Sequence, residues 1–394
     1  MKTATANPTK PTSRLRVALV VPHIFIDRDI LPKVIFSPGH LALDLARALP
    51  SQGIDITLFT PGAADTDLPN ETADLSGFQR ELDARGYGYI ELLRKHPLVF
   101  VSLARQVQAE LIAKVFQMAN RGDFDVVHIF TNEEDIALHF ARFCRVPVLF
   151  THHDPYNFLI KYKAVFPKYR QLNYISLSLA QRRTMPPDTN WRANIYHGLD
   201  PTTIQPNFQP GNYLAYLGRI IQPKGVALAI DAVEKYNRAH PGGQLKLKIA
   251  GLHYDNDGKD DYWQTQIAPH LGRQIEYVGF LAGQKKAEFL RGARALLVPS
   301  LFDEPFGVVS IEALAAGTPI IGSLSGATPE IALDGRTGFI AEPANFADYF
   351  DKIDQIDRRA CRADFEKRFT LERMARDHAE LYRRAAAEHW PNLS

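Results

Sequence analysis

Residues 295–321 read ALLVPSLFDEPFGVVSIEALAAGTPII, and this stretch decides the fold. It opens with a short continuous apolar run, which is typical of a strand buried on both faces of a parallel sheet. A loop follows at 304–307, a helix is expected to begin near Val309, and PIIGS at 319–323 predicts the next strand. A strand, a crossover helix and a second strand form a βαβ unit, so the stretch predicts an α/β protein.

The same alternation extends through the rest of the chain and predicts two doubly wound domains. Strands are expected at 16–22, 55–61, 126–130, 146–153, 174–178 and 193–198, and again at 213–218, 245–251, 275–280, 295–300, 319–323 and 337–342. The segment 198–213 is rich in Pro, Gly and Asn and reads as the linker. We therefore predict a disordered tail at 1–14, a first domain at 15–205 and a second at 206–369. The helical segment at about 370–394 is a candidate to pack back on the first domain.

Composition excludes several classes of protein. At 394 residues, with 45% apolar and 23% charged residues, the chain is an ordinary globular protein of about two domains. Lys plus Arg (46) nearly balances Asp plus Glu (44), which argues against a nucleic-acid partner. The two cysteines form no metal-binding or disulfide pattern, and no run is long enough to span a membrane. We expect a cytoplasmic protein, with no signal peptide at its polar start.

Two cations follow the first strand of the second domain. In YLGRIIQPKG an apolar strand ends at Gly218, Arg219 comes next, and Lys224 lies five residues further on. Both can converge on one anion at the carboxyl end of the strand, where Arg offers a planar fork and Lys a compact charge. The alternative is two solvated surface cations.

The loop at 304–307 predicts a second part of the same anion site. Gly307 lets backbone approach a ligand closely, and the N–H groups of Gly307, Val308 and Val309 would form an anion-binding helix N-terminus. Glu304 and Glu312 flank this site and would accept hydrogen bonds from sugar hydroxyls. The alternative is that Glu304 is an acid favoured by the helix dipole and that Glu312 is exposed.

Together with SGATPEIALDGRTGFIAEP at 325–343, these motifs resemble the retaining glycosyltransferases of family GT4, which have the GT-B fold of two Rossmann-like domains. The spacing of Glu304 and Glu312 matches the family's E-x7-E signature. The resemblance covers about the whole chain and is strongest from Gly218 to Pro343. It implies a metal-independent, retaining hexosyltransferase that needs no cofactor and takes its sugar from a nucleotide-diphosphate donor.

The resemblance implies a role for each matched position. Arg219 and Lys224 would neutralise the donor diphosphate, aided by the amides that follow Phe306. Glu312 would bind the ribose, Glu304 would hold a hydroxyl of the transferred sugar together with Phe306 and Gly307, and Gly279, Phe280 and Leu281 would seat the base. UDP is the favoured nucleotide and GDP the next, on family frequency.

In the first half the resemblance is looser. FSPGHLALDLARAL would bring Gly39 to the diphosphate, although Ser37-Pro38-Gly39 stands where many members have two glycines, and a Pro-Gly turn that simply starts a helix is the alternative. In VPVLFTHHDPYNF, His152 aligns better than His153 with the family's histidine at the reaction centre. IYHGLD has His197 in place of the family's usual asparagine.

The sequence thus predicts a two-domain enzyme that transfers a sugar with retention to a hydroxyl of a soluble small molecule or saccharide. A peripheral membrane contact through 92–116 is less favoured than a helix packed on the core. The alternatives are a sugar phosphorylase or epimerase on the same fold, and a non-catalytic subunit that binds nucleotide sugars.

Overall fold

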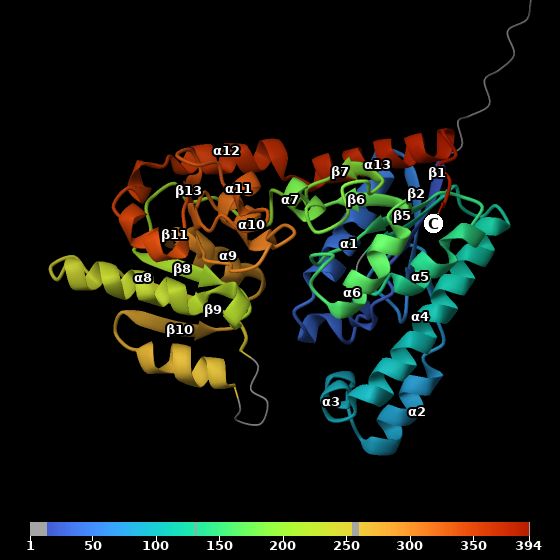
Figure 1. Ribbon diagram of the computed structural model, residues 1–394, viewed down its shortest axis with the longest axis horizontal. Helices are drawn as coiled ribbons and strands as arrows, with labels where there is room; N and C mark the ends of the chain where they lie inside the picture. Colours follow the sequence, from blue (N-terminus) through green and yellow to red (C-terminus); the bar gives the residue numbers. More distant parts are fainter. Residues whose placement is uncertain (1–13, 131, 254–259, 394) are drawn as a thin grey trace, which may run out of the picture. The chain divides into compact units, whose positions relative to one another are not determined.

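The computed structural model describes residues 14–393 except residue 131 and residues 254–259 (Figure 1). Of the expected tail at 1–14, only Arg14 falls within the described residues. Contacts group the chain into two compact units, one of residues 1–150 with 375–394 and the other of residues 151–374.

A seven-stranded sheet is built from the first half of the chain. Its order is β3-β2-β1-β4-β5-β6-β7, and each pairing for which a register is recorded is parallel. The strands are β1 Leu15–Val20, β2 Ile54–Thr60, β3 Asn70–Thr72, β4 Val126–Phe130, β5 Val148–Thr151, β6 Asn173–Ser176 and β7 Trp191–Asn194. Five of the six runs predicted for this half form strands within a few residues of the expected bounds, because burial on both faces suits continuous aliphatic side chains. The sixth, 193–198, overlaps β7 only at Ala193 and Asn194, and β7 is half-buried.

A six-stranded parallel sheet is built from the second half of the chain, with the order β10-β9-β8-β11-β12-β13. Its strands are β8 Tyr213–Leu217, β9 Leu247–Ala250, β10 Ile275–Gly279, β11 Ala293–Val298, β12 Ile320–Gly322 and β13 Gly338–Ile340. The predicted α/β architecture with two parallel sheets is confirmed. The strand order reverses between β8 and β11, which is the topological switch point where such sheets bind ligands at their carboxyl ends.

Helices flank both sheets (Figure 1). In the first half they are α1 Ser37–Ala48, α2 Ser76–Arg85, α3 Tyr89–Lys95, α4 Pro97–Asn120, α5 Asp135–Phe140, α6 Ile160–Val165 and α7 Leu179–Arg182. In the second half they are α8 Val226–Ala239, α9 Gly283–Arg291, α10 Val308–Ala315, α11 Thr328–Ile331, α12 Arg358–Arg368 and α13 Leu371–Ala387. The segment predicted as a core-packed helix is α4, whose Phe100 and Val107 join an apolar cluster with Phe78 of α2. Among the described residues, none of the helices is both long and apolar enough to cross a bilayer.

The last helix packs against the first sheet. Residues of α13 from Ala375 onward belong to the same unit as β1 and β4. His128 of β4 is fully buried, and its Nδ1 lies 2.7 Å from the hydroxyl of Tyr382 on α13. Burial lowers the pKa of His128 well below its ordinary value, and the neighbouring His378 lowers it further. This cluster therefore favours a neutral histidine in the core.

Candidate functional site

The end of β8 holds the first pair of predicted site residues. Gly218 donates its N–H to the carbonyl of Ala250 on the neighbouring strand, and the hydroxyl of Tyr216 fixes the next turn by bonding to the carbonyl of Arg219 at 2.8 Å. The Arg219 side chain is exposed. Lys224 closes a single 3-10 turn, Gln222–Lys224, which leads into α8.

Lys224 reaches the loop after β11. Its Nζ lies 2.5 Å from Oε1 of Glu304, and both side chains are mostly buried, with exposed fractions of 15% and 17%. The same Nζ sits 5.2 Å from the centroid of the Phe302 ring, and the hydroxyl of Ser300 donates to the other oxygen of Glu304 at 3.2 Å. Glu304 also helps burial to raise the pKa of Tyr216. The cation and the carboxylate, 80 residues apart in sequence, form one compact charged pair.

The loop turns into α10 at Gly307. This residue has φ +92°, a conformation that glycine adopts readily, and it caps a helix that begins at Val308. No hydrogen bond of the Gly307, Val308 or Val309 N–H groups is recorded within the described part of the chain. These groups are the donors that a helix N-terminus presents to an anion.

Glu312 lies in the second turn of α10 and is nearly buried, so the alternative of an exposed surface acid is not met. Its Oε1 accepts from Nζ of Lys286 on α9 at 2.5 Å. Lys286 was not singled out in the sequence, where QKK at 284–286 reads as an ordinary helix start. Like Glu304 with Lys224, Glu312 is paired with one lysine, but here the amine is more exposed than the carboxylate, 32% against 11%.

The residues expected to seat a base lie at the end of β10. Gly279 has φ +78° and its carbonyl accepts the N–H of Gly251 at 3.0 Å, so the chain turns sharply as the strand ends. Leu281 packs on the core of the second sheet, whereas the ring of Phe280 is 49% exposed. Phe280 therefore presents an aromatic face that is accessible to a planar ring.

The two adjacent histidines after β5 have different environments. His152 has no exposed surface, and its ring packs among Tyr156, Tyr162 and Phe166 at centroid distances of 4.6 to 4.8 Å. His153 is only partly buried and stacks on His197 at 5.1 Å with an interplanar angle of 14°.

His197 in turn contacts the loop that carries Glu304. Its ring meets Phe306 edge to face, with centroids 5.0 Å apart. Phe306 itself is buried and also lies near Tyr196. The chain of rings from His153 through His197 to Phe306 leads to the start of α10.

Gly39 lies in the first turn of α1, after Ser37 and Pro38. A side chain at this position would place a Cβ 2.7 Å from the Phe36 ring, and the Gly39 N–H donates to the carbonyl of Phe36. Close packing at the helix start thus gives this glycine a local reason to be small. The expected contact with a diphosphate stays a prediction.

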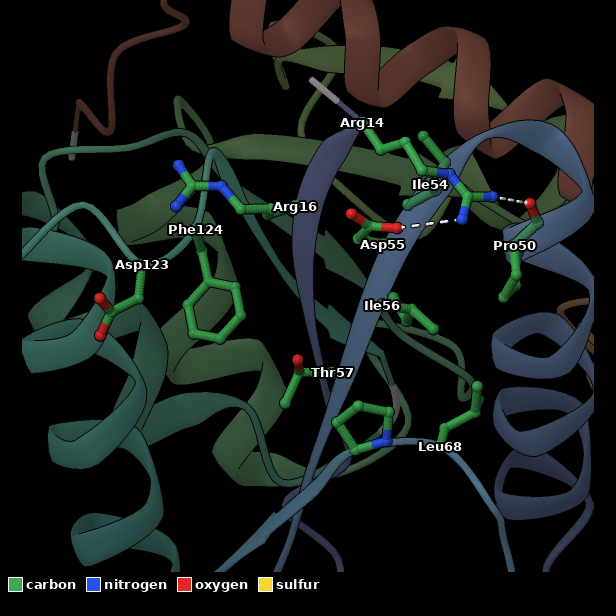
Figure 2. Close-up of a pocket in the computed structure, with 11 residues that line it drawn as sticks. Arg14, Arg16, Pro50, Ile54, Asp55, Ile56, Thr57, Leu68, Asp123 and Phe124 are labelled. Carbon is green, nitrogen blue, oxygen red and sulfur yellow. Dashed lines mark hydrogen bonds and ion pairs between the residues drawn. The ribbon is translucent and has the colours of Figure 1, made fainter. Parts of the chain in front are cut away.

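A separate hollow of about 470 Å³ opens beside the amino ends of β1 and β2 (Figure 2). Arg14 extends across it to Asp55, 3.3 Å away, and to the carbonyl of Pro50. None of the predicted site residues lines this hollow. Ligands of open α/β sheets bind at the carboxyl ends of the strands, so this hollow at the opposite end is not the candidate site.

The structure therefore brings Lys224, Glu304 and the start of α10 together and adds Lys286 beside Glu312. In the described residues no three His, Cys, Asp or Glu side chains gather as a metal site would require.

Two glycosyltransferase family models match the sequence, one in each half of the chain. The sequence model "Glycosyl transferases group 1" matches residues 203–369, and the model "Glycosyltransferase Family 4" matches residues 39–188. The first match contains the Lys224, Glu304 and Glu312 positions.

Several curated proteins are similar over part or most of the chain. A glycogen synthase of Mycobacterium tuberculosis is 36% identical over 135 residues, which are 34% of this chain and 31% of that protein, so the aligned part is about a third of the relative. A phosphatidyl-myo-inositol mannosyltransferase of Mycobacterium leprae is 24% identical and covers 86% of each chain. A D-inositol 3-phosphate glycosyltransferase of Corynebacterium aurimucosum is 28% identical over 44% of this chain and 40% of its own.

Solved structures share the fold at lower identity. The Anabaena protein HepE in complex with UDP and glucose has a TM-score of 0.66 at 18% identity, covering 93% of this chain and 98% of its own. Sucrose-phosphate synthase from Thermosynechococcus elongatus has a TM-score of 0.68 at 19% identity, covering 95% and 100%. With the two parallel sheets, these likenesses confirm the predicted GT-B fold.

Proposed function

Because the chain belongs to the family 4 glycosyltransferases, also described as glycosyl transferases group 1, we propose that it transfers a hexosyl group with retention from a UDP-sugar to a hydroxyl group. The observation that carries this proposal is a pair of Lys–Glu contacts, Lys224 with Glu304 and Lys286 with Glu312. Between the two glutamates lies the start of α10, whose first N–H groups can donate to an anion. Such a site offers positive charge for phosphates and carboxylates for hydroxyls within one short segment.

The diphosphate would bind to Lys224, Arg219 and the first amides of α10. The Lys224 ammonium carries three N–H donors, so it can keep its bond to Glu304 and still donate to a phosphate oxygen. Arg219 is exposed and adds a planar fork of donors. These charges would stabilise the diphosphate as its bond to the sugar breaks, which makes a metal ion unnecessary for that step.

The two glutamates would divide the hydroxyls of the donor. Glu312 would accept from the ribose and Glu304 from the transferred sugar, with the Phe280 ring against the base. Each carboxylate is held by a lysine, so its oxygens are oriented before the donor arrives. Orientation before binding reduces the entropy lost when the complex forms.

In the proposed step, the bond between the anomeric carbon and the leaving diphosphate breaks while the acceptor oxygen bonds to that carbon on the same face. The acceptor proton passes to the oxygen of the leaving diphosphate. No protein nucleophile is required, and the configuration at the anomeric carbon is kept.

We assign the histidine contact at the reaction centre to His153, whereas the sequence favoured His152. The support is burial and contact: His152 is enclosed by aromatic rings, while His153 is partly exposed and is linked through His197 to the Phe306 loop. An imidazole there can form a hydrogen bond to the sugar as its bond to the diphosphate breaks.

UDP is the proposed nucleotide, supported by the similarity to HepE, whose structure holds UDP and glucose. The proposed acceptor is a soluble polyol or saccharide, supported by the D-inositol 3-phosphate in the name of one relative. We place the reaction in the cytoplasm, because Cys144 and Cys361 are free, buried thiols that suit a reducing compartment.

The proposal is tested by a thermal-shift screen of nucleotide sugars, followed by a UDP-release assay with each stabilising donor. A true donor should raise the melting temperature by mass action, and UDP release should continue when EDTA is present. Phosphate-dependent sugar release without any nucleotide would indicate a phosphorylase instead. Donor binding with no UDP release in the presence of polyols and saccharides would indicate a non-catalytic subunit.

A further inference from the structure

Glu330 of α11 makes contacts far outside its own helix. Its carboxylate accepts the N–H of Leu179 at 2.9 Å, the N–H of Ala180 at 2.6 Å and the hydroxyl of Tyr196 at 3.0 Å. Both amides belong to the first turn of α7, which follows β6 about 150 residues earlier in the chain. Charge-assisted bonds of this kind are about twice as strong as neutral ones, so Glu330 fixes the start of α7.

The same short helix holds the backbone on both sides of His153. Gln181 is 1% exposed, and its amide nitrogen donates to the carbonyl of His152 at 2.8 Å and to that of Asp154 at 3.2 Å. Its amide oxygen accepts the N–H of Leu177 at 2.9 Å, so the side chain is locked in one orientation. The position of His153 therefore depends on the position of α7.

The loop that carries Glu304 is held by the residues just before α11. The N–H of Ala327 donates to the carbonyl of Glu304 at 2.9 Å, and the N–H of Gly326 donates to Asp303 at 2.9 Å. A side chain on Gly326 would place its Cβ 2.3 Å from the Glu304 nitrogen, so the two segments pack backbone to backbone. The N–H groups of Gly326 and Ala327 thus hold the Glu304 loop, while the Glu330 carboxylate of the same segment bonds to α7.

We propose that Glu330 is a positioning residue that sets the His153 turn relative to the Glu304 loop, an inference that rests on the proposed function for its kinetic consequence. Glu330 acts through α7 and Gln181 on one side and through the backbone of α11 on the other.

The kinetic test compares Glu330→Gln with wild type and with Glu342→Gln, an exposed glutamate of the same part of the chain. Gln loses the negative charge, and because Leu179 and Ala180 donate to different oxygens of Glu330, its N–H₂ group replaces the acceptor of one of these two N–H groups. We expect kcat to fall at least tenfold while the Kd for UDP, measured by calorimetry, stays within twofold of wild type. Glu342→Gln should leave both unchanged. A folded Glu330→Gln enzyme with kcat within twofold of wild type would overturn the proposal, as would a tenfold loss of UDP affinity.

Hydrogen exchange gives a readout that does not depend on activity. In Glu330→Gln, amides at 152–156 should exchange at least fivefold faster, while those at 303–307 stay within twofold of wild type. Exchange that changes only at 179–180 would overturn the coupling. If wild type releases UDP from no donor, the proposed function fails and this exchange experiment alone decides the role of Glu330. Tyr196→Phe removes one of the three bonds and should give a smaller change in the same direction, which covers the case in which Glu330→Gln does not fold.

Discussion

Replacing Lys224 by alanine removes the cation that joins the end of β8 to the loop after β11. The ammonium lies 2.5 Å from Glu304 in a pair whose side chains are 15% and 17% exposed, so water replaces it poorly. We expect kcat/KM to fall at least about a hundredfold, which corresponds to roughly 2.7 kcal/mol of lost transition-state stabilisation. The unpaired Glu304 carboxylate should also lower the melting temperature, because a mostly buried charge is left without its partner.

The assay is steady-state UDP release, run well below the melting temperature of each variant so that folding and catalysis are separated. Lys248→Ala is the matched control. Lys248 also pairs with a glutamate, Glu276 at 3.6 Å, and also lies over an aromatic ring, that of Tyr213 at 4.7 Å. Unlike Glu304, however, Glu276 is 55% exposed. This control should keep wild-type kcat/KM. A folded Lys224→Ala enzyme within threefold of wild type would refute the reasoning.

Three further predictions separate neighbouring residues or states. Glu312→Ala should weaken binding of free UDP and of the UDP-sugar alike, while Glu304→Ala should mainly weaken the UDP-sugar; calorimetry with both ligands checks this, and equal losses in both variants would reverse the assignment. His153→Ala should lower turnover with little change in nucleotide affinity, whereas His152→Ala should chiefly destabilise the fold, by about 2–4 kcal/mol for a large side chain lost from the core. Kinetics and melting curves of both variants test this, and an inactive His152→Ala beside an active His153→Ala would favour His152 again. Because burial lowers the pKa of His128 below its ordinary 6.5, the unfolded chain binds more protons than the folded one below about pH 6.5. The melting temperature should therefore fall from pH 7 to pH 5, and fall less steeply in His128→Gln; an equal dependence of the melting temperature on pH in both proteins would exclude His128 as the cause.

Most strands of both sheets were predictable because they are short, continuous apolar runs. The exceptions in the first sheet are its two edge strands: β3 Asn70–Thr72 is polar, and β7 Trp191–Asn194 is only half-buried. The turn into α10 was also predictable, since a glycine before an apolar helix marks a conformation with positive φ.

The pairing of charges was not predictable from the sequence. Lys286 and Glu312 meet only because α9 and α10 pack side by side, and neither lies within a helical turn of the other in the chain. The choice between His152 and His153 was unsafe for a different reason. Side-chain alternation holds within a strand, but β5 ends at Thr151, so the two histidines lie beyond the last residue to which alternation applies.

The central claim, sugar transfer from a nucleotide donor with retention, is tested most directly by following the purified protein and an α-linked UDP-sugar by proton NMR as turnover begins. The anomeric proton of the first sugar product, whether water or an added polyol is the acceptor, reports its configuration before free sugar can equilibrate. The proposed mechanism predicts an α-configured product that appears together with UDP. A β-configured first product, or a donor that stays intact while it measurably stabilises the protein, would contradict it.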